Sequence, residues 1–182
     1  MMTKFTLLPT LLIASSPLLS VAGPKVKITL PDFTKGDSIP AGATHDWNLG
    51  STGARGWMFS DKMETSTARQ IAITKITPNS PADGPLKVGD IILGVGDRNF
   101  SYDPRTEFGK ALTHAEEQSG ILKVLRWRDG QSVTVSLNLT VLGSYSSTAP
   151  YKCAKSKRIL EIGCEQLAEK ISNSVNRREN PI

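Results

Sequence analysis

Two short runs that stand almost back to back place the strongest constraint on how this chain folds. The run "ITPNSPADG" fills residues 76–84, and "LKVGDIILGVGD" fills residues 86–97. The first is rich in turn-forming residues, and Pro81 cannot donate to a sheet ladder. In the second, a Gly-Asp pair precedes the apolar stretch Ile91–Val95, which does not alternate with polar residues. An unbroken apolar strand is typical of a strand covered on both faces, so these residues are expected to build the domain rather than to touch a ligand.

Further strands are predicted on both sides of this buried strand. "QIAITKI" at residues 70–76 alternates at Ile71 and Ile73, and Ile76 is shifted by one position, which suggests a bulge or a strand end. "ILKVLRW" and "SVTVSLNL" are joined through Asp129-Gly130, a pair typical of a tight hairpin because both central positions of a type I′ turn need a positive φ. The alternating residues 133, 135, 137 and 139 of the second run are apolar, which predicts a half-buried antiparallel strand.

A helix is predicted between these strands, from Asp103 to just before Gly120. Apolar residues recur at helical spacing, and Asp103 followed by Pro104 is a favourable N-terminal cap. The periodic apolar residues are Phe108, Ala111, Leu112 and Ala115. The strand and helix pattern therefore predicts an α+β fold.

This pattern resembles a PDZ domain of the bacterial secreted type over residues 46–142. The resemblance is carried by "ITKITPNSPADGPLKVGDIILGVGDRNF", then "RTEFGKAL", then "LKVLRWRDGQSVTVSLNL", in the family's order and spacing. One departure is Gly96-Asp97, where the family usually has Asn-Gly; both pairs tolerate a positive φ. The resemblance implies a small, partly open antiparallel β-barrel with a helix beside a peptide-binding groove.

The resemblance also implies where a ligand would bind: a peptide adds as a strand between an edge strand and the groove helix. Aligning "LGSTGARGWMF" and "RTEFGKAL" with the family gives the expected peptide-binding residues, which are Arg55, Gly56, Trp57, Met58, Phe59, Arg105, Gly109 and Leu112. Phe108, Ala111 and Ala115 are then expected to face the core. Arg55 stands where the family has an apolar residue. Either Arg55 pairs with a terminal carboxylate, with the amides of Gly56 and Trp57, or the groove is modified and does not bind free C-termini.

The two ends of the chain differ from the central domain. Residues 1–22 read as a signal peptide with cleavage near Ala22, which predicts a secreted or periplasmic protein with no membrane span. Residues 23–45 form a lead-in segment and residues 143–155 a linker. An amphipathic helix and tail are expected over residues 156–182, and the apolar side of that helix needs a partner. It either folds back on the domain or begins a further domain.

Three stretches resemble a family of uncharacterised secreted bacterial proteins: "HDWNLGSTGARGW", "LRWRDG" and "YKCAKSKRILEIGCEQLAEKI". In that family a PDZ domain precedes a large all-helical domain of the α/α-toroid kind. The resemblance implies that this chain is an N-terminal fragment whose partner is its own downstream helical domain. Any catalytic or carbohydrate-directed function would then lie in that domain.

Charge and motifs exclude several classes of function. The net charge of +5 is concentrated in the C-terminal tail, so no basic stripe for nucleic acid is expected. No G-x-S-x-G, H-E-x-x-H or P-loop occurs, and the two histidines lack catalytic partners at motif spacing. His114 and Glu117 could hold a metal, but an exposed helical face is the simpler interpretation. We therefore expect no enzyme activity in this chain, no cofactor and no metal site.

The two cysteines are expected to stay unpaired although a secreted protein permits disulfides. Cys164 lies two turns inside the predicted helix, which puts its Cα roughly 12–15 Å from that of Cys153, whereas a disulfide needs less than about 7 Å. Two function classes remain open. One is a peptide-binding module that engages a protein C-terminus or an internal strand. The other is a scaffold domain whose groove is occupied by its own chain.

Overall fold

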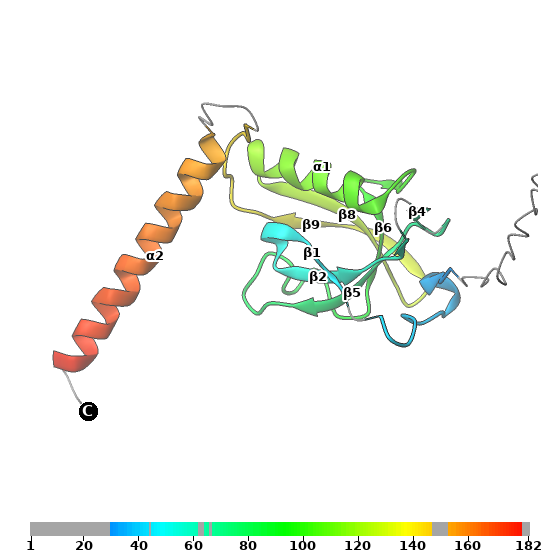
Figure 1. Cartoon of the computed structure of the whole chain (residues 1–182), viewed down its shortest axis with the longest axis horizontal. Helices are drawn as coiled ribbons and strands as arrows, with labels where there is room; N and C mark the ends of the chain where they lie inside the picture. Colours follow the sequence, from blue (N-terminus) through cyan, green and yellow to red (C-terminus); the bar gives the residue numbers. More distant parts are fainter. Residues whose placement is uncertain (1–29, 44, 62–63, 66, 147–152, 180–182) are drawn as a thin grey trace, which may run out of the picture.

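The computed structural model describes residues 30–43, 45–61, 64–65, 67–146 and 153–179. The predicted signal peptide, residues 1–22, lies outside the described residues, as does the first part of the lead-in segment. The fold is α+β, as predicted, with a PDZ-like arrangement of one helix beside an antiparallel sheet (Figure 1). The elements are η1 (Phe33–Lys35), β1 (Trp47–Asn48), η2 (Gly50–Thr52), β2 (Ala54–Trp57), β3 (Ser60–Asp61), β4 (Glu64–Thr65), β5 (Ile71–Ile76), β6 (Ile91–Val95), β7 (Arg98–Asn99), α1 (Pro104–Glu117), β8 (Ile121–Arg128), β9 (Gln131–Asn138) and α2 (Ala154–Glu179).

The main sheet has the order β1-β2-β5-β6-β8-β9, with β7 paired to β6, and all its pairs are antiparallel. The predicted hairpin is confirmed, because Asp129 and Gly130 form a two-residue turn with φ of 50° and 80°. The predicted bulge is also present: Arg55 pairs with Lys75 but Gly56 pairs with Ile73, so Thr74 is the extra residue of β5. A two-residue strand, β1, forms one edge of the sheet, and nothing in the sequence argument predicted it.

The central strand β6 is covered on both faces, which confirms the interpretation of the unbroken apolar run. Ile92 is fully buried in the main core between the sheet and α1. Its neighbour Ile91 is buried on the opposite face in a second cluster, together with Phe33, Trp57 and Ala72. Leu93 and Val95 are only partly buried and pack on these two clusters. Consecutive side chains of a strand point to opposite faces, so only a chain with two apolar layers can bury both isoleucines.

Helix α1 begins as predicted, with the Asp103 carboxylate accepting a hydrogen bond of 2.9 Å from the Arg105 amide and Pro104 in the first turn. Phe108 and Ala115 are buried against the sheet, and Ala111 is partly buried there. Leu137 of β9 and Leu139, which follows β9, are buried, whereas Val133 is exposed because the strand extends beyond the core at that end. The helix therefore turns one side to the core and leaves another side free to line a groove.

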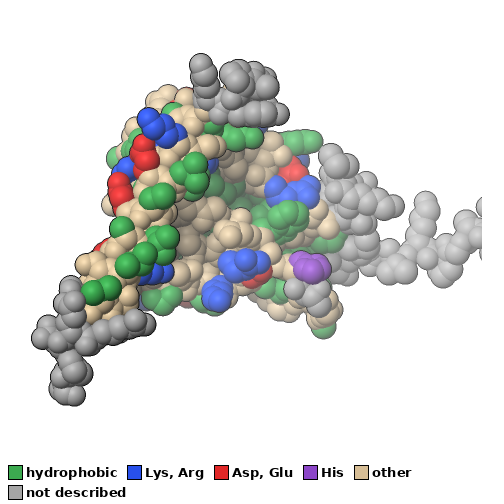
Figure 2. All heavy atoms as spheres, turned by 60° about the vertical axis from the view of Figure 1, so that its left-hand side comes forward, with side chains coloured by type: hydrophobic (Ala, Val, Ile, Leu, Met, Phe, Trp, Pro, Cys, Tyr) green, Lys and Arg blue, Asp and Glu red, His purple; other side chains and the backbone are tan. Residues whose placement is uncertain are grey.

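Helix α2 projects away from the domain (Figure 1) and begins at Ala154, two residues before the predicted start. Its base is attached by Lys155, which forms an ion pair with the buried Glu116 of α1. Hydrophobic side chains gather along one side of the helix (Figure 2) and remain exposed, among them Leu160, Leu167 and Ile171. The predicted apolar side is thus present and does not fold back on the domain. No described helix combines the length and hydropathy needed to cross a bilayer.

Both cysteines are free, as predicted. Cys153 is buried just before α2, where its Sγ lies 3.4 Å from the carbonyl oxygen of Ser144. A hydrogen bond from the Ser156 side chain, helped by backbone amides, lowers the pKa of the Cys153 thiol to about 7. Cys164 is exposed on α2.

The lead-in segment is tied to the sheet through Asp32 and Phe33. The Phe33 ring meets Trp57 edge to face, with 5.7 Å between ring centroids, and its amide donates to Gln70 at 2.7 Å. The Asp32 carboxylate accepts hydrogen bonds from Thr34 Oγ1 at 2.6 Å and from Gln70 Nε2 at 2.7 Å. These bonds, that from Thr34 above all, lower the pKa of Asp32 to about 2.

The depressed pKa of Asp32 predicts a loss of stability in acid. A carboxylate whose pKa falls on folding stabilises the native state above its unfolded pKa, and this contribution disappears as pH falls from about 4 toward about 2. Wild-type protein should therefore exceed Asp32→Asn in free energy of unfolding at pH 6, and the difference should shrink toward pH 2. Denaturant titrations of both proteins at several pH values measure it. A difference that stays constant with pH would contradict the assignment.

Candidate peptide-binding groove

A small apolar cavity lies between α1 and the hairpin formed by β1 and β2. Its volume is about 130 Å³, and its lining residues are Trp47, Asn48, Leu49, Met58, Arg105, Phe108, Gly109 and Leu112. Four predicted site residues, Met58, Arg105, Gly109 and Leu112, are therefore brought together here. Phe108 was expected only in the core, but it reaches the groove floor as well. A space of this size fits an apolar side chain of a bound strand rather than a large ligand.

Gly109 is the most informative of these lining residues. It lies inside α1, where glycine costs about 1 kcal/mol relative to alanine. A Cβ atom added at Gly109 would meet no atom within 4 Å. The packing of the described residues therefore does not require a glycine at this position. Its absent side chain leaves room in the groove for an incoming group.

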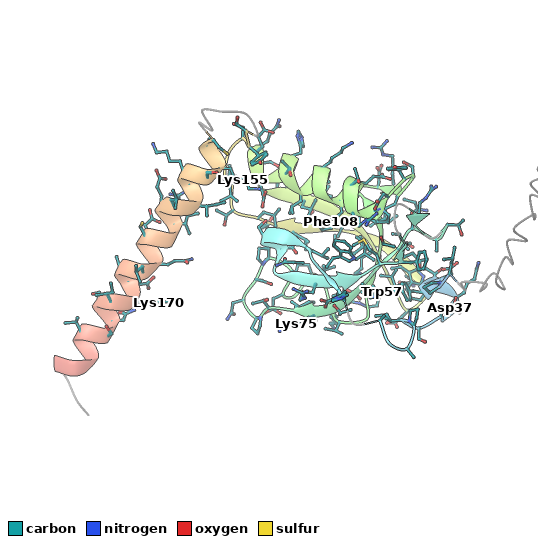
Figure 3. All side chains as sticks on the ribbon, viewed as in Figure 1. Asp37, Trp57, Lys75, Phe108, Lys155 and Lys170 are labelled. Carbon is teal, nitrogen blue, oxygen red and sulfur yellow. The ribbon has the colours of Figure 1, made fainter. Side chains whose placement is uncertain are left out.

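The side chains of β2 alternate, so only some of the predicted residues face the groove. Gly56 and Met58 are on the side of α1, where a Cβ atom at Gly56 would lie 2.5 Å from Ile71 Cγ2. Trp57 points to the other face, into the cluster with Phe33, and Phe59 packs against the same cluster. Figure 3 shows Phe108 beneath α1 and Trp57 on the far side of the sheet, close to η1. Trp57 and Phe59 thus support the groove from behind instead of lining it.

Arg55 is also turned away from the groove and is held by Asp46. Its Nε donates to Asp46 Oδ1 at 2.7 Å, and its Nη2 donates to the Asp46 carbonyl oxygen at 2.9 Å. The hydroxyl of Thr74 donates to the other carboxylate oxygen of Asp46 at 2.7 Å. The Arg55 guanidinium, followed by the Thr74 hydroxyl, lowers the pKa of Asp46 below its usual value. The Arg55 charge that could have received a terminal carboxylate is therefore already paired within the chain.

The glycine-rich loop between β1 and β2 uses its own amides. Leu49 N–H donates to the Ala54 carbonyl at 3.0 Å, and Gly50 N–H donates to Asn48 Oδ1 at 2.9 Å. Gly53 N–H bonds to the Gly50 carbonyl, and Ala54 N–H bonds to Thr52 Oγ1. The two residues whose amides were expected to receive a carboxylate are in sheet pairs, Gly56 with Trp47 and Ile73, and Trp57 with Ala72. This loop is a closed turn rather than an anion cradle.

The strand β1 is the feature of the site that sequence reasoning missed. Trp47 and Asn48 pair antiparallel with Gly56 and Arg55, on the outer edge of β2. In the described residues, the segment just before the glycine loop pairs with this edge. The available signal was Trp47, a large apolar residue between polar neighbours directly before the loop. Beyond Gly56, no described strand pairs with the outer edge of β2.

Arg105 crosses the mouth of the groove. Its guanidinium donates hydrogen bonds to both oxygens of the Asp103 carboxylate, with Nη2 2.6 Å from Oδ2. Its Nη1 donates to Ser60 Oγ at 2.8 Å. The same guanidinium lies 5.4 Å from the ring centroid of Trp47, within cation–π range. Arg105 lowers the pKa of Asp103, and Asp103 in turn raises the pKa of Arg105. One side chain of α1 thus contacts both the β1 strand and the start of β3.

Metal chemistry has no support within the described residues, which contain no group of three His, Cys, Asp or Glu side chains placed to hold an ion. His114 and Glu117 are both exposed on α1. The apolar groove is therefore the site on which a function can be argued.

Comparisons with known proteins add little to this geometry. No protein-family model matches the sequence, and no match was found among curated proteins. Among solved structures, the chain is similar to an HtrA-type protease, AlgW with a decapeptide, at 21% identity and a TM-score of 0.36. The match covers 58% of this chain and 30% of that chain. At this TM-score the PDZ-like fold rests on the strand order and on the position of α1, not on the similarity.

Proposed function

We propose that this chain is a protein-binding module of the PDZ-like kind, which receives a strand of a peptide or protein between β2 and α1. The observation that carries the proposal is the apolar groove containing a mid-helix glycine that the packing of the described residues does not require. A bound strand would pair with the outer edge of β2 and place an apolar side chain between Met58 and Gly109. In this proposal the protein acts outside the cytoplasm and performs no catalysis of its own.

The geometry favours an internal strand over a free C-terminus as the ligand. Carboxylate capture needs several unpaired donors, because a desolvated carboxylate is costly to leave unsatisfied. In this site Arg55 lies on the face of β2 opposite to the groove, and the amides of Gly53 and Ala54 are bonded within the turn. The main-chain bonds of an added strand and one apolar side chain in the groove require neither of these groups.

A second candidate function is a scaffold that positions a downstream helical domain. Two observations favour it: part of the β2 edge is already paired with β1, and α2 exposes an apolar side along its length. In the scaffold function the groove is closed and only α2 engages a partner. Binding measurements on the groove separate the two functions.

The test is a screen of a strand-length peptide library against the mature chain, with each hit measured with a free and with an amidated C-terminus. We expect hits whose affinity survives amidation. Gly109→Phe should fill the groove and weaken these hits more than tenfold, because its ring occupies the space that the ligand side chain needs. Gly163→Phe is the matched control, since Gly163 also lies inside a helix and has open space around it, but on α2.

Three outcomes would count against the proposal. Failure to find any peptide favours the scaffold function. Equal loss of binding in Gly109→Phe and Gly163→Phe would show that the effect of the Gly109 substitution is not specific to the groove. Hits that vanish on amidation show that carboxylate capture, not internal strand addition, is the mode of recognition.

A further inference from the structure

The strand β1 lies where a ligand strand would have to lie. It pairs antiparallel with Arg55 and Gly56 on the outer edge of β2, and Trp47 and Asn48 form one wall of the groove. A peptide that adds to this edge by main-chain hydrogen bonds needs the same donors and acceptors. Residues 46–48, which we call the strap, and an added strand therefore exclude each other along this part of β2.

The strap is held by a small number of contacts, and these are partly exposed to solvent. Among the described residues, its ladder with β2 has two residue pairs, next to the bond from the Leu49 amide to the Ala54 carbonyl. On one side Asp46 is bonded to Arg55, whose side chain is 41% exposed, and to the Thr74 hydroxyl. On the other side Trp47, 43% exposed, lies against Arg105. Exposed ion pairs and short strands contribute little stability. In contrast, Leu49 directly after the strap is buried in the main core, so it anchors the segment when the strap moves.

We propose that the strap is an autoinhibitory element: it covers the outer edge of β2 in the resting state and is displaced when a ligand strand binds. This inference rests on the proposed function, because it concerns the regulation of the same groove. The Asp46–Arg55 pair and the Trp47–Arg105 contact hold the strap closed from opposite sides of the sheet. Whatever weakens either contact raises the affinity of the groove, since apparent affinity scales with the fraction of molecules whose edge is open.

The strap itself supplies a probe of known fit to this edge. A labelled synthetic peptide ATHDWNL, residues 43–49 of the chain, is titrated against full-length mature protein by fluorescence anisotropy. Asp46→Asn in the protein keeps the shape of the side chain but removes its charge, so the strap loses its ion pair with Arg55. We expect the probe to bind Asp46→Asn about tenfold more tightly than wild type, the change expected when the open fraction rises from about a tenth to most molecules.

A covalent lock gives the opposite result in the same assay. Because the Leu49 amide bonds to the Ala54 carbonyl, the next facing pair, Asn48 and Arg55, is a non-hydrogen-bonded pair. Such pairs have Cα atoms about 4.5 Å apart, within the range that a disulfide spans. In a Cys164→Ser background, the double variant Asn48→Cys and Arg55→Cys oxidised with glutathione disulfide should not bind the probe. Reduction with dithiothreitol should restore binding to at least the wild-type level.

Each result decides for or against the strap. Tighter binding by Asp46→Asn together with redox-dependent binding by the double variant supports it. Equal binding by wild type, Asp46→Asn and the oxidised variant overturns it, as does absence of probe binding to every protein. A library peptide whose affinity is unchanged by the oxidised lock leaves the proposed function standing and overturns the strap alone. Probe binding that follows the predicted pattern, without any library hit, supports the strap and counts against the proposed function.

Discussion

Replacing Gly94 with alanine is expected to destabilise the domain by about 3 kcal/mol, because there is no room for a side chain in β6 at this position. A Cβ atom at Gly94 would lie 1.8 Å from the Arg98 carbonyl oxygen and 2.8 Å from the Asn99 Cα. Both neighbours are backbone atoms of β7, which turns back onto β6 directly after Gly96. Either β7 separates from the sheet or the central strand distorts. The free energy of unfolding from a urea titration measures the loss.

The matched control is the same substitution at the glycine of the groove. Gly109→Ala meets no atom within 4 Å and replaces a poor helix former, so it should stabilise the protein by about 1 kcal/mol. The two alanine substitutions are therefore predicted to have opposite signs. A destabilising effect at Gly109 would show that its neighbourhood is closed in solution. A neutral effect at Gly94 would show that β7 does not pack on β6 as described.

The substitution Ile92→Ala is expected to cost about 3–4 kcal/mol in free energy of unfolding, because it leaves a cavity in a fully buried part of the main core. Ile92 lies on the side of β6 that faces α1, so its loss also loosens the floor beneath the groove helix. Thermal or urea unfolding followed by circular dichroism measures the effect.

Leu167→Ala on α2 is the control for Ile92→Ala. Leu167 is 59% exposed, so its truncation should change stability by less than about 0.5 kcal/mol. A cost of several kcal/mol at Leu167 would show that the apolar side of α2 is buried in solution, by a second copy or by the domain itself. A small cost at Ile92 would contradict the position of β6 at the centre of two packed layers.

Much of the fold follows from local sequence patterns. The Asp129-Gly130 turn, the Asp103-Pro104 start of α1 and the bulge near Ile76 depend on the φ preferences, caps and side-chain periods of a few neighbouring residues. The unbroken apolar run of β6 indicated burial on both faces, although the residues that cover each face come from distant parts of the chain. The resemblance to the PDZ family implied that Arg105, Gly109 and Leu112 of α1 face the groove, and these three residues do line one cavity.

Contacts between distant parts of the chain decided which residues face the groove and which segment pairs with the outer edge of β2. Residues 55–59 were expected to form one ligand-binding stretch, yet strand alternation turns Arg55, Trp57 and Phe59 away from α1 and leaves Met58 in the groove. The partner of Arg55 could not be read from the sequence, because Asp46 reaches it only after the chain reverses through η2, and Thr74 joins them from the bulge of β5. Local propensities determine which residues form strands and turns, whereas pairing at a sheet edge depends on which segments are brought together and compete for the same hydrogen bonds. For this chain the sequence therefore determined the groove helix and the buried strand, and the tertiary structure alone decided that β1 occupies the edge where a ligand strand would bind.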